Sequence, residues 1–365
     1  MKKQLVLIIL ILQSVFTLAQ VPTQERDALM ALYNATNGPN WTFPGQWGST
    51  TTPVADWFGV NVENILGQDH VTVISLCCNG LSGYIPTEIE GLSYLKTLDL
   101  SGNQLPGDIP IVLFSLTNLE DLSLEGCQLS GIIPSEIGDL LNLTNLSLIS
   151  NQLTGNLPPE IGDLLNLSIL NVRNNQLSGS IPTEIENLLS IEGIALSYNE
   201  FSGELDLSNL INLYGLLIEN NNFLSLNVQN GNNTNFAMFN ITNNPNLICV
   251  FVDDTSWSET NWLDKDETAQ YFETQAECDT YLSIDENITV SSIRLFPNPT
   301  SRFVNIDMHK GVLIKNVQVY SVLGEQMNTS YTSDKIDLTK LNKGVYFIKL
   351  QDETNKNFTY KIIKK

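Results

Sequence analysis

The stretch LTNLSLISNQLTGNLPPEIGDLLN, residues 143–166, decides the fold because its outline recurs along the chain at a step of 24 residues. Regular copies begin at Val71, Leu95, Leu119, Leu143, Leu167 and Ile191, and looser copies begin at Leu213 and Phe236. Self-similarity at a fixed step of this length predicts a stack of identical structural units. The copy from Ile191 has only 22 residues, so the stack should be less regular towards its C-terminal end.

Apolar residues stand at positions one, four and six of each copy, as Leu143, Leu146 and Leu148 do. The alternation at positions four and six is typical of a short strand with one buried face. A single strand of this kind cannot bury that face. Stacked copies bury it because each unit covers the next, with their strands paired in parallel.

Position nine of the copies carries a polar side chain that recurs in almost every unit. It is occupied by Asn79, Asn103, Cys127, Asn151, Asn175, Asn199, Asn221 and Asn244. An asparagine amide both donates and accepts hydrogen bonds, so this ladder should satisfy backbone groups of its own and of neighbouring coils. A small buried thiol is a tolerable substitute, so we expect Cys127 to be structural rather than reactive.

A glycine stands at position thirteen of the regular copies, and Ile-Pro or Leu-Pro follows in five of them, for example Ile133-Pro134. Glycine adopts backbone angles that other residues resist. Proline has a fixed φ and no backbone donor, so it should end the second extended segment of each unit.

These residues resemble the plant-type class of leucine-rich repeat proteins, whose unit is LxxLxLxxNxLxGxIPxxIGxLxx. The resemblance covers about residues 71–248, and residues 143–166 match it nearly throughout. It implies an α/β leucine-rich-repeat solenoid with a parallel β-sheet on the concave face. The convex side would be mostly irregular or 3-10 helical.

Two segments are expected to cap this solenoid, because its ends must hide the core from water. Residues 20–70 contain ERDALMALYNATNGPNW, in which Ala28, Leu29 and Leu32 recur at helical spacing. Trp41, Trp47 and DWFGV (56–60) follow, and this segment is similar to the N-terminal capping region of the same family. The aromatic residues could instead form a ligand platform, but we favour the capping role.

The second cap comprises residues 249–287. For an exported chain we expect a disulfide between Cys249 and Cys278, which would stabilise this cap by about 3–4 kcal/mol in the chain-entropy model. The remaining cysteines are Cys77, Cys78 and Cys127. Neighbouring side chains at the end of a strand point in opposite directions, and neither Cys77 nor Cys78 is assigned a partner.

Acidic residues of the second cap are Asp253, Asp254, Asp264 and Asp266. They could hold Ca²⁺, which binds several oxygen ligands. Their spacing matches no EF-hand loop, so we favour a solvated acidic face and expect no metal site.

Residues 288–365 lack the 24-residue step. A Pro-Asn-Pro turn is followed by alternating residues such as Val304, Ile306 and Met308, and several short strand-like runs predict a small antiparallel β-sandwich. LFPNPTSRFVNI (295–306), VQVYSVLGEQM (317–327), GVYFIKL (344–350) and KIIKK (361–365) resemble the type A C-terminal sorting domain of the type IX secretion system of Bacteroidetes. That resemblance implies contact with the secretion machinery and export across the outer membrane, often followed by removal of the domain. An appended β-domain with no sorting role is the alternative.

The first nineteen residues have the pattern of a signal peptide: Lys2 and Lys3, then an apolar run, then small residues up to Ala19. A membrane anchor is the alternative, but the run is short for a bilayer. We expect no transmembrane segment in the mature chain, which should be secreted or held at the outer cell surface.

The net charge of −22 is unevenly distributed. Residues 21–287 hold 34 acidic and 4 basic side chains, whereas residues 288–365 hold 6 acidic and 12 basic ones. Such a change of sign indicates a domain boundary, and the acidic part argues against nucleic acid as a partner.

Chemistry-bearing motifs are missing from the sequence. Its two histidines, His70 and His309, fall in different domains, and no nucleophile, zinc or nucleotide motif is present. We therefore expect no enzyme activity, no catalytic residue and no cofactor.

The expected function is recognition of a protein or polysaccharide through the concave face, which exposes positions two, three, five, seven and eight. The candidate residues are Lys96, Asp99, Glu120, Asp121, Ser123, Glu125, Asn145, Ser147, Asn171, Arg173, Glu192, Tyr198, Tyr214 and Glu219. This acidic and polar surface with two tyrosines suits a basic protein patch or a polysaccharide. The alternative is a structural surface-coat, matrix or adhesion component whose repeats only pack.

Overall fold

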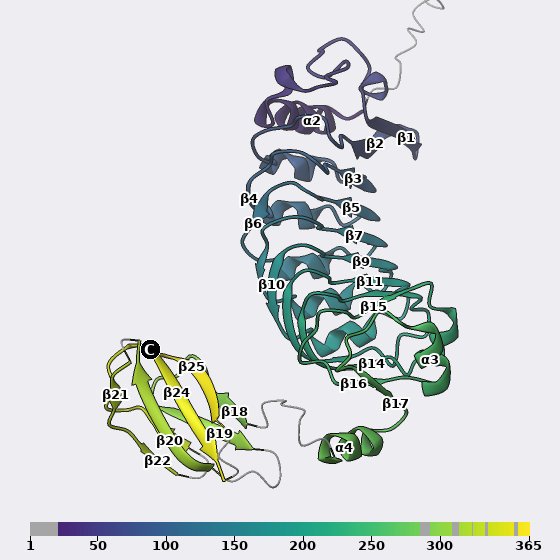
Figure 1. The fold of residues 1–365 in the computed structure, drawn as a ribbon. Coiled ribbons are helices and arrows are strands. Elements are labelled where there is room, and N and C mark those ends of the chain that lie inside the picture. The colour runs from purple at the N-terminus through teal and green to yellow at the C-terminus, as the bar shows by residue number, and fades with distance from the viewer. Residues whose placement is uncertain (1–20, 285–292, 309–313, 323, 333–334, 354–356) are drawn as a thin grey trace, which may run out of the picture. The chain divides into compact units, whose positions relative to one another are not determined.

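The computed structural model describes residues 21–284, 293–308, 314–322, 324–332, 335–353 and 357–365. The expected signal peptide and His309 lie outside the described residues. The chain splits into two compact units between Cys278 and Asp279, and both are drawn in Figure 1.

A nine-stranded sheet runs the length of the first unit (Figure 1). Its strands are, in spatial order, β1 (Val60–Ile65), β2 (Gln68–Ser75), β3 (Thr97–Asp99), β5 (Asp121–Ser123), β7 (Asn145–Ser147), β9 (Ile169–Asn171), β11 (Gly193–Ala195), β13 (Gly215–Leu217) and β15 (Met238–Asn240). β1 and β2 pair antiparallel, and each later strand pairs in parallel with the one before. The register joins equal repeat positions, as in Leu122 beside Leu146, so the leucines at position four form one buried row.

The other side of each coil is built from short 3-10 helices and a second set of strands. The helices are η3 (Thr87–Gly91), η4 (Ile111–Ser115), η5 (Ser135–Asp139), η6 (Pro159–Asp163) and η7 (Thr183–Asn187). Each begins directly after a repeat proline, for example Pro134 before η5. Proline lacks the backbone donor that a helix start leaves unpaired, so it ends the extended segment and suits the entry to the helix. The solenoid architecture expected from the sequence is confirmed.

The second set of strands becomes longer towards the C-terminal end. β4 (Gly107–Asp108) pairs with β6 (Leu129–Ser130), and a six-stranded sheet contains β8 (Thr154–Gly155), β10 (Gln176–Gly179), β12 (Glu200–Asp206), β14 (Asn222–Asn227), β16 (Cys249–Phe251) and β17 (Gln270–Phe272). β12 and β14 have seven and six residues, whereas β8 has two. The copies from Ile191 on lack the Ile-Pro pair, so no proline stops their pairing.

The asparagines at position nine bond to backbone groups of two coils. Asn151 Nδ2 donates to the carbonyl oxygens of Leu124 at 2.8 Å and Leu148 at 3.1 Å, and its Oδ1 accepts from the amide nitrogens of Cys127 and Leu129. Asn103, Asn175, Asn199, Asn221 and Asn244 also donate to carbonyl groups of their own and the preceding coil. The ladder therefore ties each coil to the next through groups that are largely shielded from water.

Two residues at position nine, Asn79 and Cys127, bond differently from the other members of the ladder. Asn79 Nδ2 donates to the carbonyl of Phe43, and its Oδ1 accepts from the Phe43 amide, so it joins the first coil to the N-terminal cap. Cys127 is fully buried, and its thiol lies 3.2 Å from the Leu100 carbonyl oxygen. Burial raises the pKa of this thiol to about 12, which keeps it protonated at neutral pH, and the structural role of Cys127 stays a prediction.

The N-terminal cap consists of α2 (Thr23–Ala35), two 3-10 turns, η1 (Gly38–Asn40) and η2 (Val54–Asp56), and the β1–β2 hairpin. Trp41, Trp47 and Trp57 are each buried, so they pack the end of the core rather than form an exposed platform. Glu25 on α2 is buried too, with one oxygen 2.5 Å from His70 Nδ1 and the other accepting from the Val71 amide. This carboxylate therefore fastens the helix to the first long strand.

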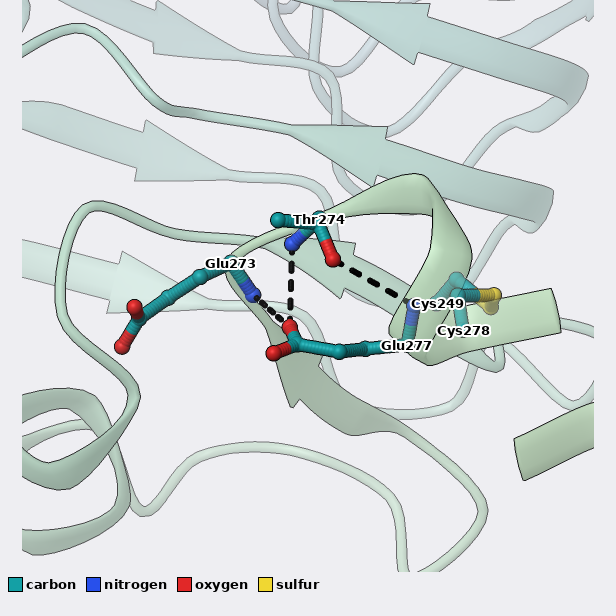
Figure 2. Close-up of a disulfide and its surroundings, with 5 residues drawn as sticks. All are labelled: Cys249, Glu273, Thr274, Glu277 and Cys278. Carbon is teal, nitrogen blue, oxygen red and sulfur yellow. Dashed lines mark hydrogen bonds between the residues drawn. A yellow bond between two sulfur atoms is a disulfide. The ribbon is translucent and has the colours of Figure 1, made fainter. Parts of the chain in front are cut away.

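The copy that begins at Leu213 ends in η8 (Asn233–Asn235), and the C-terminal cap contains α3 (Thr255–Asn261), β17 and α4 (Gln275–Ile284). Cys249 of β16 and Cys278 of α4 form a disulfide with a Cα–Cα distance of 6.0 Å, which confirms that the chain has a disulfide. Figure 2 shows how α4 begins: the Glu277 amide donates to Thr274 Oγ1, while its carboxylate accepts from the amides of Glu273 and Thr274. This capping box fixes the helix start next to the bridge.

The second unit is a sandwich of two antiparallel four-stranded sheets. One contains β18 (Ile293–Phe296), β19 (Phe303–Met308), β22 (Ser330–Tyr331) and β23 (Lys335–Asp337), and the other contains β20 (Ile314–Ser321), β21 (Gln326–Met327), β24 (Gly344–Asp352) and β25 (Asn357–Lys364). Val304 and Ile306 of one sheet share a core with Val317 and Val319 of the other, as the alternation predicts. The side chain of Met308 lies outside the described residues.

Candidate ligand-binding face

The solvent side of the nine-stranded sheet, called here the concave face, carries the candidate residues on and beside its strands. Exposed are Glu120, Glu125, Glu192, Tyr198 and Tyr214; half-buried are Lys96, Asp99, Asp121, Ser123, Asn145, Ser147, Asn171 and Arg173; buried is Glu219. Because adjacent strands pair at equal repeat positions, the residues at one position form a row across neighbouring coils.

Glu219 differs from the expectation of exposure, since it is only 6% exposed. One carboxylate oxygen accepts from the Ser197 hydroxyl at 2.5 Å, and the other lies 3.6 Å from Arg173 Nη2. These two partners on neighbouring coils hold the carboxylate against the sheet, so Glu219 is a structural group. The hydroxyl oxygen of Ser147 is buried as well, and it faces no polar partner within the described part of the chain.

The first half of the concave face is acidic. Glu120 and Glu125 are exposed around β5, with Asp99 and Asp121 half-buried beside them. Burial raises the pKa of the Asp121 carboxyl, and a hydrogen bond from Asn145 works in the opposite direction. These carboxylates form a region of negative potential that would attract a cationic group.

Residues 21–284 contain only four basic side chains, and each is already engaged. Lys96 pairs with Glu63 at 2.8 Å, and that bond raises its pKa. Arg26 donates to the backbone carbonyls of Ser49 and Thr52, Arg173 pairs with Glu219, and Lys265 lies 3.6 Å from Glu259. Lys96 also interacts with Glu120, which adds to the rise in the Lys96 pKa, so its charge offsets only part of the negative charge of this region.

Apolar side chains gather on the second half of the concave face, beside the exposed Glu192, and the sequence interpretation did not include them. Met238 is 51% exposed and Ile149, Ile169 and Leu217 are half-buried, all at positions three, five or seven of their copies. Gly193 and Gly215 lie among them in β11 and β13, with no side chain to cover the sheet. Tyr198, at 50% exposure, and Tyr214, at 37%, belong to the same coils. The apolar residues at outward positions of these copies indicate this surface in the sequence, whereas the predicted site included mainly polar residues.

Three of the four acidic residues of the C-terminal cap accept hydrogen bonds from backbone amides, while Asp253, Asp254 and Asp264 are exposed to solvent. Asp266 accepts from the amides of Asn243 and Asn244, and Asp253 accepts from those of Gly231 and Asn233. Asp254 accepts from Trp257 at the start of α3. No further repeat follows to accept hydrogen bonds from these backbone amides, so the carboxylates of the cap accept them. Among the described residues no cluster of three His, Cys, Asp or Glu could hold a metal ion.

A hollow of about 610 Å³ lies away from the concave face, over the 3-10 helices. Phe114, Gly138, Asp139, Gly162 and Asp163 are among the residues that line it. The regular spacing of η4, η5 and η6 produces this open trough. No helix in the described residues is both long enough and apolar enough to cross a membrane.

Comparison with known proteins supports both parts of this description. The family model of the leucine-rich repeat matches residues 69–129, and a second leucine-rich repeat model matches residues 142–164 and 166–188. The model of the secretion system C-terminal sorting domain matches residues 294–365. The chain therefore contains leucine-rich repeats followed by a secretion system C-terminal sorting domain, and a domain of this kind implies interaction with a secretion machinery. A search of curated proteins found no match.

Solved structures with a similar fold include several plant proteins. A plant ice-binding protein is 22% identical with a TM-score of 0.50, and the match covers 64% of this chain and 88% of that one. The ectodomain of the receptor kinase GASSHO1/SCHENGEN3 from Arabidopsis thaliana is 27% identical with a TM-score of 0.51, and the match covers 62% of this chain and 33% of that one. The Arabidopsis receptor kinase HAESA is 21% identical with a TM-score of 0.54, over 68% of this chain and 42% of that one. This chain thus spans less than half the length of either receptor chain.

Proposed function

We propose that the protein is exported by a type IX secretion system to the cell surface or the medium, where its concave face binds a protein or a polysaccharide. The observation that supports this is the division of that face into an acidic half around Glu120 and Glu125 and an apolar half around Tyr198, Tyr214 and Met238. A ligand with cationic groups beside apolar or ring surface complements both halves.

The similar GASSHO1/SCHENGEN3 ectodomain was solved in complex with CASPARIAN STRIP INTEGRITY FACTOR 2, so a solenoid of this kind serves as a binding surface in that protein. Here the exposed aromatic and methionine side chains would supply contact area, while the unpaired carboxylates would select for positive charge. A basic protein segment fits these two features together. A polysaccharide would use mainly the tyrosine rings.

The test is capture by the purified full chain on arrays of basic peptides and of polysaccharides. The triple variant Glu120→Ala, Asp121→Ala and Glu125→Ala should weaken capture of basic ligands about tenfold, because three lost charge contacts of roughly 0.5 kcal/mol each amount to about 1.5 kcal/mol. Raising the salt concentration should also weaken capture of basic ligands by the wild-type chain, because salt screens the charges. Tyr198→Ala with Tyr214→Ala should weaken both classes of ligand.

The matched control is Asp139→Ala, Asp163→Ala and Glu184→Ala, which removes three exposed carboxylates from the 3-10 helices and should leave capture unchanged. Equal losses in both triple variants would show a general charge effect and contradict a site on the concave face. No capture by any chain would favour the structural surface-coat or matrix role.

Export is tested separately by fractionating cultures of the native organism and measuring intact mass. The proposal expects a surface or medium form that begins near Gln20 and ends before about Ser292. A full-length chain confined to the periplasm would contradict export and removal of the sorting domain.

A further inference from the structure

Cys77 and Cys78 are adjacent, exposed and at positions seven and eight of the first coil, on the concave face. Their sulfur atoms lie 2.9 Å apart, which is closer than an ordinary contact between unbonded sulfurs. The expectation that these side chains point in opposite directions is therefore wrong.

The backbone at position eight explains the difference. Cys78 has a φ of +56°, and this left-handed conformation recurs at position eight of the other coils, for example in Ser150, Asn174 and Tyr198, each also at +56°. Strand alternation requires extended backbone at both residues, so a left-handed residue at the strand end breaks it. The repeat geometry itself thus brings two consecutive side chains together, and the first coil places cysteines there.

The other cysteines do not compete for this pair. Cys249 and Cys278 are bonded to each other, and Cys127 is fully buried with its thiol directed at the Leu100 carbonyl. Hydrogen bonding to Cys78 and partial burial raise the pKa of Cys77 to about 11, with the carboxylates of Asp99 and Glu125 adding to the shift. A thiol that stays protonated at neutral pH attacks a disulfide slowly, so the pair does not resemble a catalytic redox site, and its own oxidation by exchange should be slow.

We propose that Cys77 and Cys78 are an oxidative modification site that closes into a disulfide between adjacent residues on the concave face. The proposal depends on the export proposed above, because disulfides persist outside the cytosol. The oxidant is the disulfide of a thiol–disulfide exchange protein or of oxidised glutathione. One cysteine attacks that disulfide and releases a thiol, and the second attacks the mixed disulfide and releases the other. Two electrons and two protons pass to the oxidant, which leaves as two thiols.

The resulting bond should be easier to reduce than Cys249–Cys278. Consecutive Cα atoms are about 3.8 Å apart, which is shorter than the separation of about 4.4–6.8 Å in ordinary disulfides. Cys249 and Cys278 are 6.0 Å apart at Cα and buried, whereas Cys77 and Cys78 are exposed. Strained and accessible disulfides are the labile ones.

Trypsin makes the test unambiguous because basic residues are so few. Arg26 and Lys96 bound a peptide, residues 27–96, that contains Cys77 and Cys78 but no other cysteine. Cys127 falls in residues 97–173, Cys249 in residues 174–265 and Cys278 in residues 266–294. The purified full chain is equilibrated in glutathione buffers of increasing reducing strength, quenched in acid, alkylated and digested under denaturing conditions.

In oxidising buffer the peptide 27–96 should appear unalkylated and two hydrogens lighter than the dithiol form. We express reducing strength as the squared concentration of reduced glutathione divided by the concentration of oxidised glutathione. The value that half-reduces the Cys77–Cys78 bond should be at least about tenfold lower than the value that separates peptides 174–265 and 266–294. Cys78→Ser should give peptide 27–96 with one alkyl group or one glutathione. Cys127→Ser should leave peptide 27–96 as in the wild-type chain.

Two alkyl groups on peptide 27–96 in oxidising buffer would overturn the proposal, as would a link from it to peptide 97–173 or to a second copy of itself. If the Cys77–Cys78 disulfide needs a more reducing buffer than Cys249–Cys278, the claim that it is the more easily reduced bond would be wrong. Exported chain recovered with both thiols free would exclude the modification in the cell while leaving export established. Exported chain with the bridge closed would support both.

Discussion

The repeat unit and the C-terminal sandwich bury apolar side chains in different ways. The core of the first unit is one continuous cluster of mostly leucine and isoleucine side chains that extends from Val21 to Tyr271, and within it each coil is covered by its neighbours. The sandwich closes a small core between two sheets, from Ile293 to Ile362. The first unit also needs side-chain amides such as that of Asn151 between coils, whereas the strands of the second satisfy each other. A destabilising substitution should therefore affect only the adjacent coils in the solenoid, whereas in the sandwich it should affect the entire domain.

The largest effect should come from Ile348→Ala in β24, where the side chain is fully buried in the sandwich. Loss of this side chain should destabilise the sandwich by about 2–5 kcal/mol. Calorimetry of the full chain should show its transition lowered or lost while that of the repeat unit is unchanged. Phe347→Ala, at a 36% exposed position of the same strand, is the control and should have a smaller effect. A matching fall in both transitions would contradict the independence of the two cores.

Next in size is Cys278→Ser, which opens a bridge between residues 29 apart in sequence. The repeat unit should lose about 3 kcal/mol of stability in urea unfolding, and the loss should concentrate at the C-terminal cap. Cys249→Ser combined with Cys278→Ser should be no worse than either alone, since one bridge is lost in all three variants. Additive losses would show that the sulfur atoms contribute by packing rather than by the bond.

Asn151→Ala tests the ladder. It removes two donated bonds to Leu124 and Leu148 and leaves the amides of Cys127 and Leu129 without their side-chain acceptor. We expect a loss of at least about 2 kcal/mol, because buried unsatisfied groups cost about 1–3 kcal/mol each. Hydrogen exchange should accelerate in that coil and its two neighbours. Gln152→Ala, the adjacent exposed position, should change neither quantity.

The smallest effect should be a gain. Cys127→Asn would extend the ladder into the one regular coil that lacks it, and the Leu100 carbonyl already accepts from the residue at this place. The gain should be at most about 1 kcal/mol, the net value of one hydrogen bond. Urea unfolding measures it. A loss would mean that the coil has closed around the smaller thiol. The Leu105 amide donates to the Cys127 backbone carbonyl instead of to a side-chain oxygen.

Much of this architecture follows from local pattern. The 24-residue step, the leucines at positions four and six and the asparagine at position nine specify each coil within its own length, and copies of one coil must stack to bury their apolar faces. Val304, Ile306, Val317 and Val319 specify the two faces of the sandwich by alternation alone. The sequence therefore determined both folds and the place of the sorting domain.

Only the tertiary structure decided which outward positions are available. Glu219 is buried because Ser197 and Arg173, 22 and 46 residues earlier, lie beside it in the stack. The apolar side chains of the second half of the concave face are uncovered because Ile169 lies beside Gly193 and Met238 lies beside Gly215 across paired strands. Cys77 and Cys78 meet because position eight is left-handed. Exposure, charge pairing and side-chain direction depend on what the neighbouring coil presents, and a pattern within one coil does not contain that information.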